Sequence, residues 1–314
     1  MKKDQTTVIE SELYRDAIEG LSKKPKQLPS KYFYDKRGSD LFEQITELDE
    51  YYPTDCEMEI MRRYIIEITS FLGPKIQLVE LGSGSSMKTR LLLEHCKDVM
   101  MYVPVDISGS YIEEVADQLR EEFPGIDIHP VAADYTSPFI IAEIKDANKR
   151  VIYFPGSTIG NFNIDKAKTF LNTIADNLTS GDGLLIGVDL KKDVSVLEAA
   201  YNDSKGVTAA FNKNILTRLN RELNTDFDLN QFRHRAFYNY KKGRIEMHLE
   251  SLRNQKVQIN GQQALFKKGE TIHTENSHKY TIQEFEKLTD ESFSRIMTWT
   301  DSRDYFSVHY FEKI

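Results

Sequence analysis

Cysteine is scarce in this sequence, with two residues, Cys56 and Cys96, among 314. Two cysteines cannot form the disulfide framework that holds small secreted domains together, and their spacing is not that of a zinc site. Because isolated thiols usually stay reduced inside the cell, we expect a cytoplasmic protein. The segment from Met1 to Glu12 is polar and charged, which is not the pattern of a secretory signal.

Long apolar runs and an excess of positive charge are also missing. No apolar stretch approaches the roughly 20 residues that a membrane-spanning helix needs. Asp and Glu total 49 against 41 for Lys and Arg, so the formal net charge is −8. An acidic chain is a poor electrostatic match for a phosphate backbone. These two absences predict a protein that binds neither membrane nor nucleic acid, and we expect a monomer.

Histidine spacing gives little support for a metal site. His273 and His278 could share one ion only on a bent segment, and the other five histidines are scattered. We therefore predict that the protein holds no metal.

Apolar residues nevertheless make up 40 % of the chain, which is enough to bury a sizeable core. In the first 60 or so residues, apolar side chains recur at helical spacing, as Leu13, Ala17 and Leu21 do. A second apolar stripe runs from Leu41 to Leu48, and we expect Ser39 to cap that helix.

From about residue 75 the pattern changes to strands that alternate with helices. The predicted strands cover residues 76–81, 100–105, 126–133, 151–154 and 184–190, and predicted helices cover 111–123 and 167–178. Such alternation is typical of a parallel sheet with helices on both faces. Ligands bind such sheets at the carboxyl ends of the strands, where glycines and acidic residues gather in this sequence.

Residues 191–280 interrupt the alternation. A helix is predicted over 206–223, followed by strands over 244–252, 257–259, 264–268 and 271–279. The α/β pattern then resumes with a helix over 281–288 and two strands, 295–299 and 305–311, which fit an antiparallel edge. We therefore predict one domain from residues 1–55 and 191–280, and another from 56–190 and 281–314.

A glycine turn is the first sign of a nucleotide-like cofactor. Gly82 and Gly84 follow the strand over 76–81, and glycine lets the backbone approach a ligand closely. The third glycine of the dinucleotide fingerprint is replaced by Met87. Asp106 ends the next strand, where a carboxylate can accept both ribose hydroxyls. This layout favours an S-adenosylmethionine-dependent methyltransferase, with a nicotinamide enzyme as the competing interpretation.

Motifs spread over nearly the whole chain carry a more specific signal. They are Leu28–Phe42, Glu50–Thr54, Val79–Ser85, Pro104–Ser108, Gly156–Phe162, Ala200–Asn212, Arg244–Met247, Thr274–Tyr280 and Trp299–Asp301. In this set and order, the sequence resembles the histidine-specific, S-adenosylmethionine-dependent N-α-methyltransferases of ergothioneine biosynthesis. The resemblance implies a Rossmann-like class I methyltransferase sheet, mostly parallel with an antiparallel last strand, and an inserted α+β substrate-binding subdomain. It also implies S-adenosylmethionine as cofactor, S-adenosylhomocysteine as product and free L-histidine, converted to hercynine, as substrate.

The resemblance also implies roles for particular residues. For the substrate's amino and carboxylate groups these are Tyr51, Asn161 and Tyr201, and for its imidazole ring Met247, Glu275 and Ser277. For the cofactor they are Gly82, Gly84, Lys88, Asp106, Asp134 and Tyr135, the last two at the adenine. Tyr34 and Asn161 would be catalytic, with Tyr34 next to the reacting nitrogen. The sequence departs from the family pattern mildly, with Tyr135 in place of a common Phe and Asn202 in place of an Asp.

Elementary chemistry is consistent with an imidazole site. Glu275 and Ser277 are two apart on a predicted strand and so face the same side. A carboxylate can accept from one ring nitrogen, and a hydroxyl can serve the other. The competing interpretations are an exposed edge strand for this pair and an ordinary glycine-rich turn for Asn161. Two further functions stay open: N-methylation of another amino acid, such as Trp or Tyr, and a non-catalytic protein that binds S-adenosylmethionine.

Overall fold

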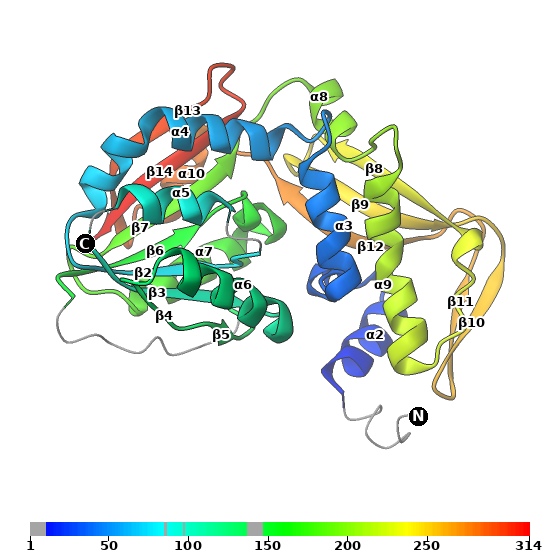
Figure 1. Ribbon diagram of the computed structural model, residues 1–314. Coiled ribbons are helices and arrows are strands. Elements are labelled where there is room, and N and C mark those ends of the chain that lie inside the picture. Colours follow the sequence, from blue (N-terminus) through cyan, green and yellow to red (C-terminus); the bar gives the residue numbers. More distant parts are fainter. Residues whose placement is uncertain (1–10, 85–86, 97, 137–146) are drawn as a thin grey trace. The chain divides into compact units, whose positions relative to one another are not determined.

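The computed structural model describes residues 11–84, 87–96, 98–136 and 147–314. The chain divides into two compact units, shown with the rest of the ribbon in Figure 1. Unit 1 comprises Met1–Tyr51 and Asp193–Asn276, and unit 2 comprises Tyr52–Lys192 and Ser277–Ile314. The boundaries expected from the sequence differ from these by two to four residues. That one unit serves the substrate and the other the cofactor stays a prediction.

Unit 2 is built on one large sheet. Its strands are β2 (Ile76–Leu81), β3 (Val99–Asp106), β4 (Asp127–Ile128), β5 (Val131–Ala132), β6 (Lys149–Phe154), β7 (Gly183–Asp189), β13 (Phe293–Thr300) and β14 (Phe306–Lys313). The strand order is β13-β14-β7-β6-β2-β3-β4, and β5 also pairs with β3. When β2, β3, β4, β6 and β7 are numbered 1 to 5, they lie side by side in the order 3-2-1-4-5, which is the arrangement of the Rossmann fold.

The last strand, β14, is antiparallel to both of its neighbours, β7 and β13, whereas the strands from β2 to β7 pair in parallel. This confirms the predicted Rossmann-like methyltransferase sheet with an antiparallel last strand. The final two strands lie at one edge of the sheet, as predicted. The outermost strand is β13, which runs parallel to β7 because β14 reverses direction between them.

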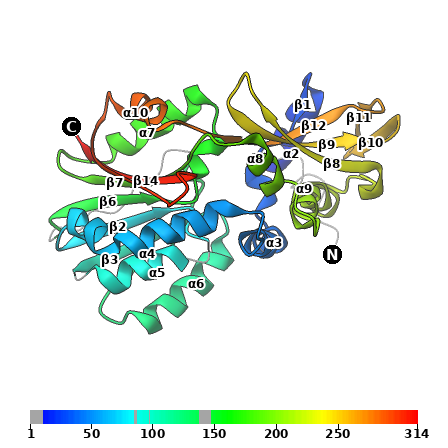
Figure 2. The ribbon, with the colours of Figure 1, turned by 90° about the horizontal axis from the view of Figure 1, so that it is seen from above.

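Helices cover both faces of this sheet (Figure 2). On one face lie α4 (Tyr52–Leu72), α5 (Met87–His95) and α6 (Gly109–Glu122), and on the other lie α7 (Ile164–Asp176) and α10 (Ile282–Thr289). Because both faces are covered, β2 and β7 are buried along their whole length and are mostly apolar. A capping box of Thr281 and Glu284 begins α10.

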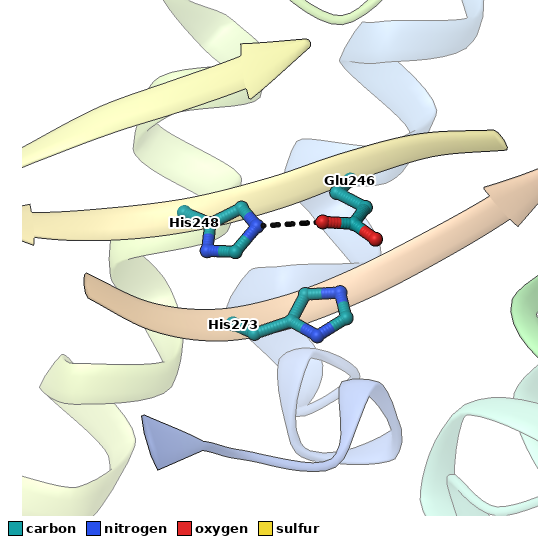
Figure 3. Close-up of side chains that lie close together, drawn as sticks. All are labelled: Glu246, His248 and His273. Atoms are coloured by element: carbon teal, nitrogen blue, oxygen red, sulfur yellow. Dashed lines mark hydrogen bonds and ion pairs between the residues drawn. The ribbon is translucent and has the colours of Figure 1, made fainter. Parts of the chain in front are cut away.

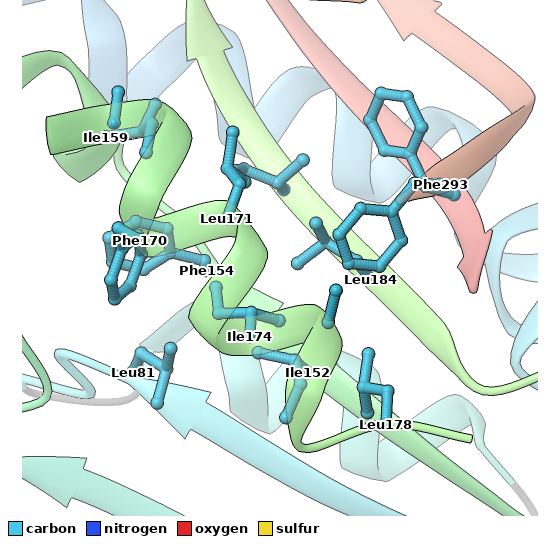
Figure 4. Packing of buried hydrophobic residues seen from close by; sticks show 14 of the residues in the cluster. Leu81, Ile152, Phe154, Ile159, Phe170, Leu171, Ile174, Leu178, Leu184 and Phe293 are labelled. Atoms are coloured by element: carbon cyan, nitrogen blue, oxygen red, sulfur yellow. The ribbon is translucent and has the colours of Figure 1, made fainter. Parts of the chain in front are cut away.

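The core of unit 2 is centred on α7 (Figure 4). Phe170, Leu171 and Ile174 recur at helical spacing along α7 and pack on Ile152 and Leu184 of the sheet. At about 25 cal/mol per Å² of apolar surface, burying side chains of this size stabilises the fold by about 2 kcal/mol each. This packing fixes the carboxyl ends of the central strands, where the candidate cofactor residues begin.

Unit 1 contains a four-stranded sheet of order β1-β12-β9-β8 and a two-stranded hairpin of β10 and β11. The strands are β1 (Lys26–Gln27), β8 (Phe232–Asn239), β9 (Arg244–Ser251), β10 (Gln255–Ile259), β11 (Gln262–Phe266) and β12 (Thr271–His278), whose last two residues fall in unit 2. The helices are α2 (Glu12–Ser22), η1 (Ser30–Phe33), α3 (Lys36–Thr46), α8 (Val194–Ala200), α9 (Val207–Leu223) and η3 (Leu229–Gln231). The long helix α9 lies along the sheet, where Asn212 donates a hydrogen bond to the carbonyl of His248 on β9.

Three details correct the sequence analysis. Asp35, not Ser39, caps α3, because its carboxylate accepts from the Gly38 N–H at 2.9 Å. The strand expected over 126–133 is split into β4 and β5, with Pro130, which cannot donate to a ladder, between them. Strand β8 was not expected at all. No helix in the described part of the chain is long and apolar enough to cross a membrane.

Candidate functional site

The glycine turn at the end of β2 has the backbone that the sequence predicts. Gly82 has φ +74° and Gly84 has φ +48°, a region that side chains other than glycine rarely adopt. The Gly82 N–H donates to the carbonyl of Val105 on the adjacent strand at 2.8 Å. A Cβ on Gly82 would lie 3.5 Å from the Tyr135 ring, whereas one on Gly84 would meet no atom of the described residues within 4 Å. The turn therefore lets a ligand approach the main chain at Gly84.

Asp106 lies beside this turn, at the carboxyl end of β3. One carboxylate oxygen accepts from the Ser108 N–H at 2.9 Å, and the other lies 3.4 Å from the Gly84 nitrogen. Burial raises the pKa of this carboxyl, while the backbone N–H groups favour its charged form. A carboxylate has about four acceptor positions, so it can still accept from two neighbouring hydroxyl groups.

Asp134 and Tyr135 follow β5, at the same edge of the sheet, where the parallel strands end. Asp134 accepts from the Thr136 N–H at 3.0 Å, which fixes the carboxylate in a short turn. The Tyr135 ring packs edge-on against Phe154, with centroids 5.7 Å apart, and also contacts Phe170. Burial raises the pKa of Tyr135, so its hydroxyl stays protonated near neutral pH. Unit 2 thus brings Gly82, Asp106 and Tyr135 together.

Lys88 is held by a residue that sequence reasoning missed. It forms an ion pair with Glu57, a fully buried residue of α4. Both oxygens of Glu57 also lie within 3.1 Å of the Gly156 nitrogen, just after β6. The Glu57 carboxylate thus connects Lys88 with the end of β6. No local pattern marks Glu57, because its partners are far away in the sequence.

A second buried carboxylate, Glu80, lies on β2 itself, just before the glycine turn. Glu80 accepts hydrogen bonds from the hydroxyls of Thr89, at 2.6 Å, and Tyr102. Burial raises its pKa to about 7, because the charged form loses its hydration. The turn therefore rests on a polar group whose protonation changes near neutral pH.

Asn161 and Ser277 belong to unit 2, on neighbouring pieces of backbone. Asn161 ends the short helix η2 (Thr158–Asn161), and Ser277 lies near the end of β12. A Cβ on Gly160 would lie 2.9 Å from the carbonyl oxygen of His278. The turn that carries Asn161 therefore packs directly on the strand end that carries Ser277. The Ser277 hydroxyl accepts from Lys279 at 2.7 Å, another contact that the sequence did not predict.

Unit 1 gathers the three predicted substrate tyrosines into one aromatic cluster. The Tyr34 ring meets Phe42 and Phe211 edge-on, with centroids 5.8 and 5.6 Å away. The centroid of the Tyr51 ring lies 6.3 Å from that of Phe42 and 6.2 Å from that of Tyr201. The faces of aromatic rings can accommodate an alkylated ammonium group through cation–π attraction.

Met247 and Glu275 lie on β9 and β12 of unit 1. The carbonyl of Met247 and the side chain of Thr274 are 3.0 Å apart, and the Met247 side chain is buried. The backbone carbonyl of Glu275 accepts from Nε2 of His273 at 3.0 Å. Met247 and Glu275 are therefore placed by backbone contacts within the same sheet.

Glu246, His248 and His273 form the one group among the described residues with metal-ligand types close together (Figure 3). The two imidazole rings are stacked, with centroids 4.7 Å apart and planes 14° from parallel. Nearly parallel stacked rings cannot aim their lone pairs at one ion. Arg244 already donates to Glu246 at 2.6 Å, and burial lowers the pKa of His273 to about 4. The arrangement favours a packed polar stack, and the prediction of no metal stays a prediction.

Comparison with known proteins gives a consistent result. The family described as "Histidine-specific methyltransferase, SAM-dependent" matches residues 13–313. The histidine N-alpha-methyltransferase of Mycolicibacterium smegmatis is 42 % identical over 295 residues, covering 92 % of this chain and 91 % of that protein. That of Mycobacterium tuberculosis is 41 % identical over 302 residues, covering 94 % and 93 %. Ergothioneine biosynthesis protein 1 of Neurospora crassa is 32 % identical over 290 residues, covering 90 % of this chain and 32 % of that protein.

Proposed function

Because the chain belongs to the family of histidine-specific, S-adenosylmethionine-dependent methyltransferases, we propose that it methylates the α-amino group of free L-histidine. Three successive transfers would give the trimethylated betaine, hercynine, as a step of ergothioneine biosynthesis. The observation that carries this proposal is the similarity to two proteins named for histidine N-α-methylation over more than nine tenths of the chain. The arrangement of the predicted site residues within each unit supports it.

The residues of unit 2 fit the cofactor. The open backbone at Gly84 would receive the methionine part, and the Asp106 carboxylate would accept from the ribose hydroxyls. Asp134 and Tyr135 would contact the adenine, and Lys88 would approach from its ion pair with Glu57. When bound, S-adenosylmethionine supplies an electrophilic methyl group on a sulfonium centre, so no metal or covalent intermediate is needed.

We assign Tyr51 and Tyr201 of unit 1 and Asn161 of unit 2 to the amino and carboxylate groups. An asparagine amide suits that task, because it can donate to a carboxylate and accept from an amine. Glu275 and Ser277 would bind the two ring nitrogens of the imidazole, and Met247 would pack against the ring.

Catalysis on this account is mainly positioning. The amine must be neutral and in line with the methyl group before it attacks. The α-amino group of a peptide has a pKa near 8, and the adjacent carboxylate of a free amino acid raises that pKa, so only a small neutral fraction exists near pH 7. We assign Tyr34, or a water that it holds, to receive the departing proton. The aromatic cluster around Tyr34 would then tolerate the increasingly methylated ammonium group.

The test is the mass of the product after incubation with S-adenosylmethionine and each of a panel of free amino acids. A nucleosidase that removes S-adenosylhomocysteine keeps product inhibition from masking weak substrates. We expect a gain of three methyl groups on histidine and no gain on tryptophan or tyrosine. Methylation of another amino acid with histidine untouched would retain the fold and the cofactor but refute the roles of Glu275 and Ser277. Binding of the cofactor without turnover of any amino acid would instead favour the non-catalytic alternative.

A further inference from the structure

A buried group of charges lies at the end of β7 in unit 2. Asp189 is 1 % exposed and sits between two lysines, Lys192 and Lys279, whose side chains are 3 % and 0 % exposed. The ammonium nitrogens lie 2.5 and 2.6 Å from its carboxylate oxygens. The hydroxyl of Tyr52 also lies within 2.9 Å of both oxygens. Three charged side chains are thus withdrawn from water at one point.

The two lysines carry one more positive charge than is needed to neutralise Asp189. A single cation neutralises a single carboxylate, and a second buried cation adds a desolvation cost that packing alone does not justify. Although burial opposes it, the two lysines hold the pKa of Asp189 below its ordinary value. Burial lowers the pKa of Lys192 to about 8, which reflects the same cost. A second role for one lysine would explain why both are buried.

The two lysines differ in what else they contact. Lys192 donates to the hydroxyl of Tyr52 at 2.8 Å and to the carbonyl of Leu190 at 2.5 Å. Lys279 instead donates to the hydroxyl oxygen of Ser277 at 2.7 Å. Ser277 is the residue assigned above to one ring nitrogen of the substrate. Lys279 is therefore the lysine that connects the buried carboxylate with the proposed imidazole site.

Hydrogen-bond chemistry gives this contact a direction. An ammonium group donates and never accepts, whereas a serine hydroxyl has one hydrogen and two lone pairs. When Lys279 occupies one lone pair of Ser277, the hydrogen of Ser277 has to point away from the lysine. We propose that Lys279, anchored by Asp189, is a positioning residue that holds the Ser277 hydroxyl as a donor toward the substrate ring, so that the site selects a ring with an acceptor nitrogen.

This inference rests on the proposed function and adds a basis for its specificity. A neutral imidazole has one lone-pair nitrogen that can accept from Ser277, whereas an indole offers one N–H and no acceptor. The positive charge of Lys279 behind the hydroxyl strengthens that donation, because hydrogen bonds supported by a charge are stronger than neutral ones. A substrate without an acceptor nitrogen could not accept this hydrogen bond from Ser277.

A double-mutant cycle tests whether Lys279 acts through Ser277. The variants are Lys279→Met, Ser277→Ala and the two combined, and the readouts are KM for histidine and kcat. We expect Lys279→Met to raise KM about tenfold with a smaller change in kcat, and to have little effect once Ser277 is alanine. Equal effects of Lys279→Met in both backgrounds would overturn the proposal.

Lys192→Met is the matched control, because it removes the other cation from the same carboxylate. A purely structural role of the charge group predicts the same change in KM from both lysine substitutions, with no coupling to Ser277. Our account predicts that Lys192→Met lowers the melting temperature but shows no coupling to Ser277→Ala. Coupling of the same size for both lysines would also refute the assignment to Lys279.

A second measurement needs no variant and so survives a failure of Lys279→Met to fold. Calorimetry on the wild-type protein with S-adenosylhomocysteine would compare thienylalanine with two isomers of thiazolylalanine, those attached through ring positions 4 and 5. These rings are similar in size, but each thiazole places an acceptor nitrogen at one of the two ring-nitrogen positions. We expect at least one thiazole isomer to bind about tenfold more tightly than thienylalanine. Equal binding of all three would contradict the proposal, whereas a wild-type enzyme that does not methylate histidine would refute the proposed function itself.

Discussion

Replacing Gly160 by alanine should damage both stability and turnover. The added Cβ would lie 2.9 Å from the carbonyl oxygen and 3.1 Å from the nitrogen of His278, whereas ordinary contact begins at about 3.4 Å. Both obstacles are backbone atoms, so neither can move away as a flexible side chain would. The alanine would therefore push two segments about half an ångström apart: the short helix η2, which carries Asn161, and the end of β12, which carries Ser277.

The size of the effect follows from that displacement. Overpacking of this kind costs about 1–3 kcal/mol, and each kcal/mol lowers the melting temperature of a domain of this size by about 2–4 °C. Because Asn161 and Ser277 are both assigned to the substrate, we also expect kcat/KM for histidine to fall about tenfold or more. Thermal melting and steady-state kinetics measure the two effects separately.

Gly125→Ala is the control for this substitution, because Gly125 is exposed and an added Cβ there meets nothing within 4 Å. That variant should melt and turn over like the wild type. If Gly160→Ala did the same, the close packing between η2 and the end of β12 would not exist as described. A loss of stability with normal kinetics would show that the contact is real but does not position the site.

Three further predictions address other parts of the account. Glu57→Gln should weaken S-adenosylmethionine binding about tenfold and lower the melting temperature, because Lys88 loses its buried partner. Calorimetry with the exposed Glu94→Gln as control would show it, and unchanged affinity would refute the role of Glu57. Tyr34→Phe should lose more activity at pH 7 than at pH 9, where a much larger fraction of the amine has already lost its proton, and a small loss at every pH would refute proton transfer by Tyr34. Burial raises the pKa of Glu80 from 4.5 to about 7 in the folded state. Between these two pH values the folded protein keeps the Glu80 proton while the unfolded chain has lost it, so stability falls as the pH rises from 4.5 to 7. Relative to Glu80→Gln, the unfolding free energy of the wild type should therefore decrease by roughly 3 kcal/mol between pH 4.5 and 8 in chemical denaturation, and a constant difference would contradict it.

Much of the fold could be predicted because its signals are local. The central strands of the large sheet are buried on both faces, so they appear as largely apolar runs such as Leu184–Val188. Strand β8 gave no such signal, because Arg233 and Arg235 alternate with His234 on a sheet that is only partly covered. The antiparallel insertion of β14 inside the edge was also beyond local patterns, since strand order depends on contacts between distant segments.

The candidate site divides in the same way. The glycine turn and Asp106 could be predicted, because a turn and a strand end have their own sequence patterns. The supporting residues could not be predicted. Glu57 meets Gly156 across 99 positions, and Lys279 meets Asp189 across 90. Buried charges are identified by their partners, and only the folded chain brings those partners together.

Our central proposal is that this protein recognises the imidazole ring of free histidine and methylates the α-nitrogen of the same molecule. The most direct measurement is one reaction that contains equal amounts of histidine, tryptophan and tyrosine with deuterium-labelled S-adenosylmethionine, followed by fragmentation of every labelled product. The account predicts that histidine alone is labelled and that all of its new methyl groups are on the α-nitrogen. Label on a ring nitrogen, or on either of the other amino acids in preference to histidine, would contradict it.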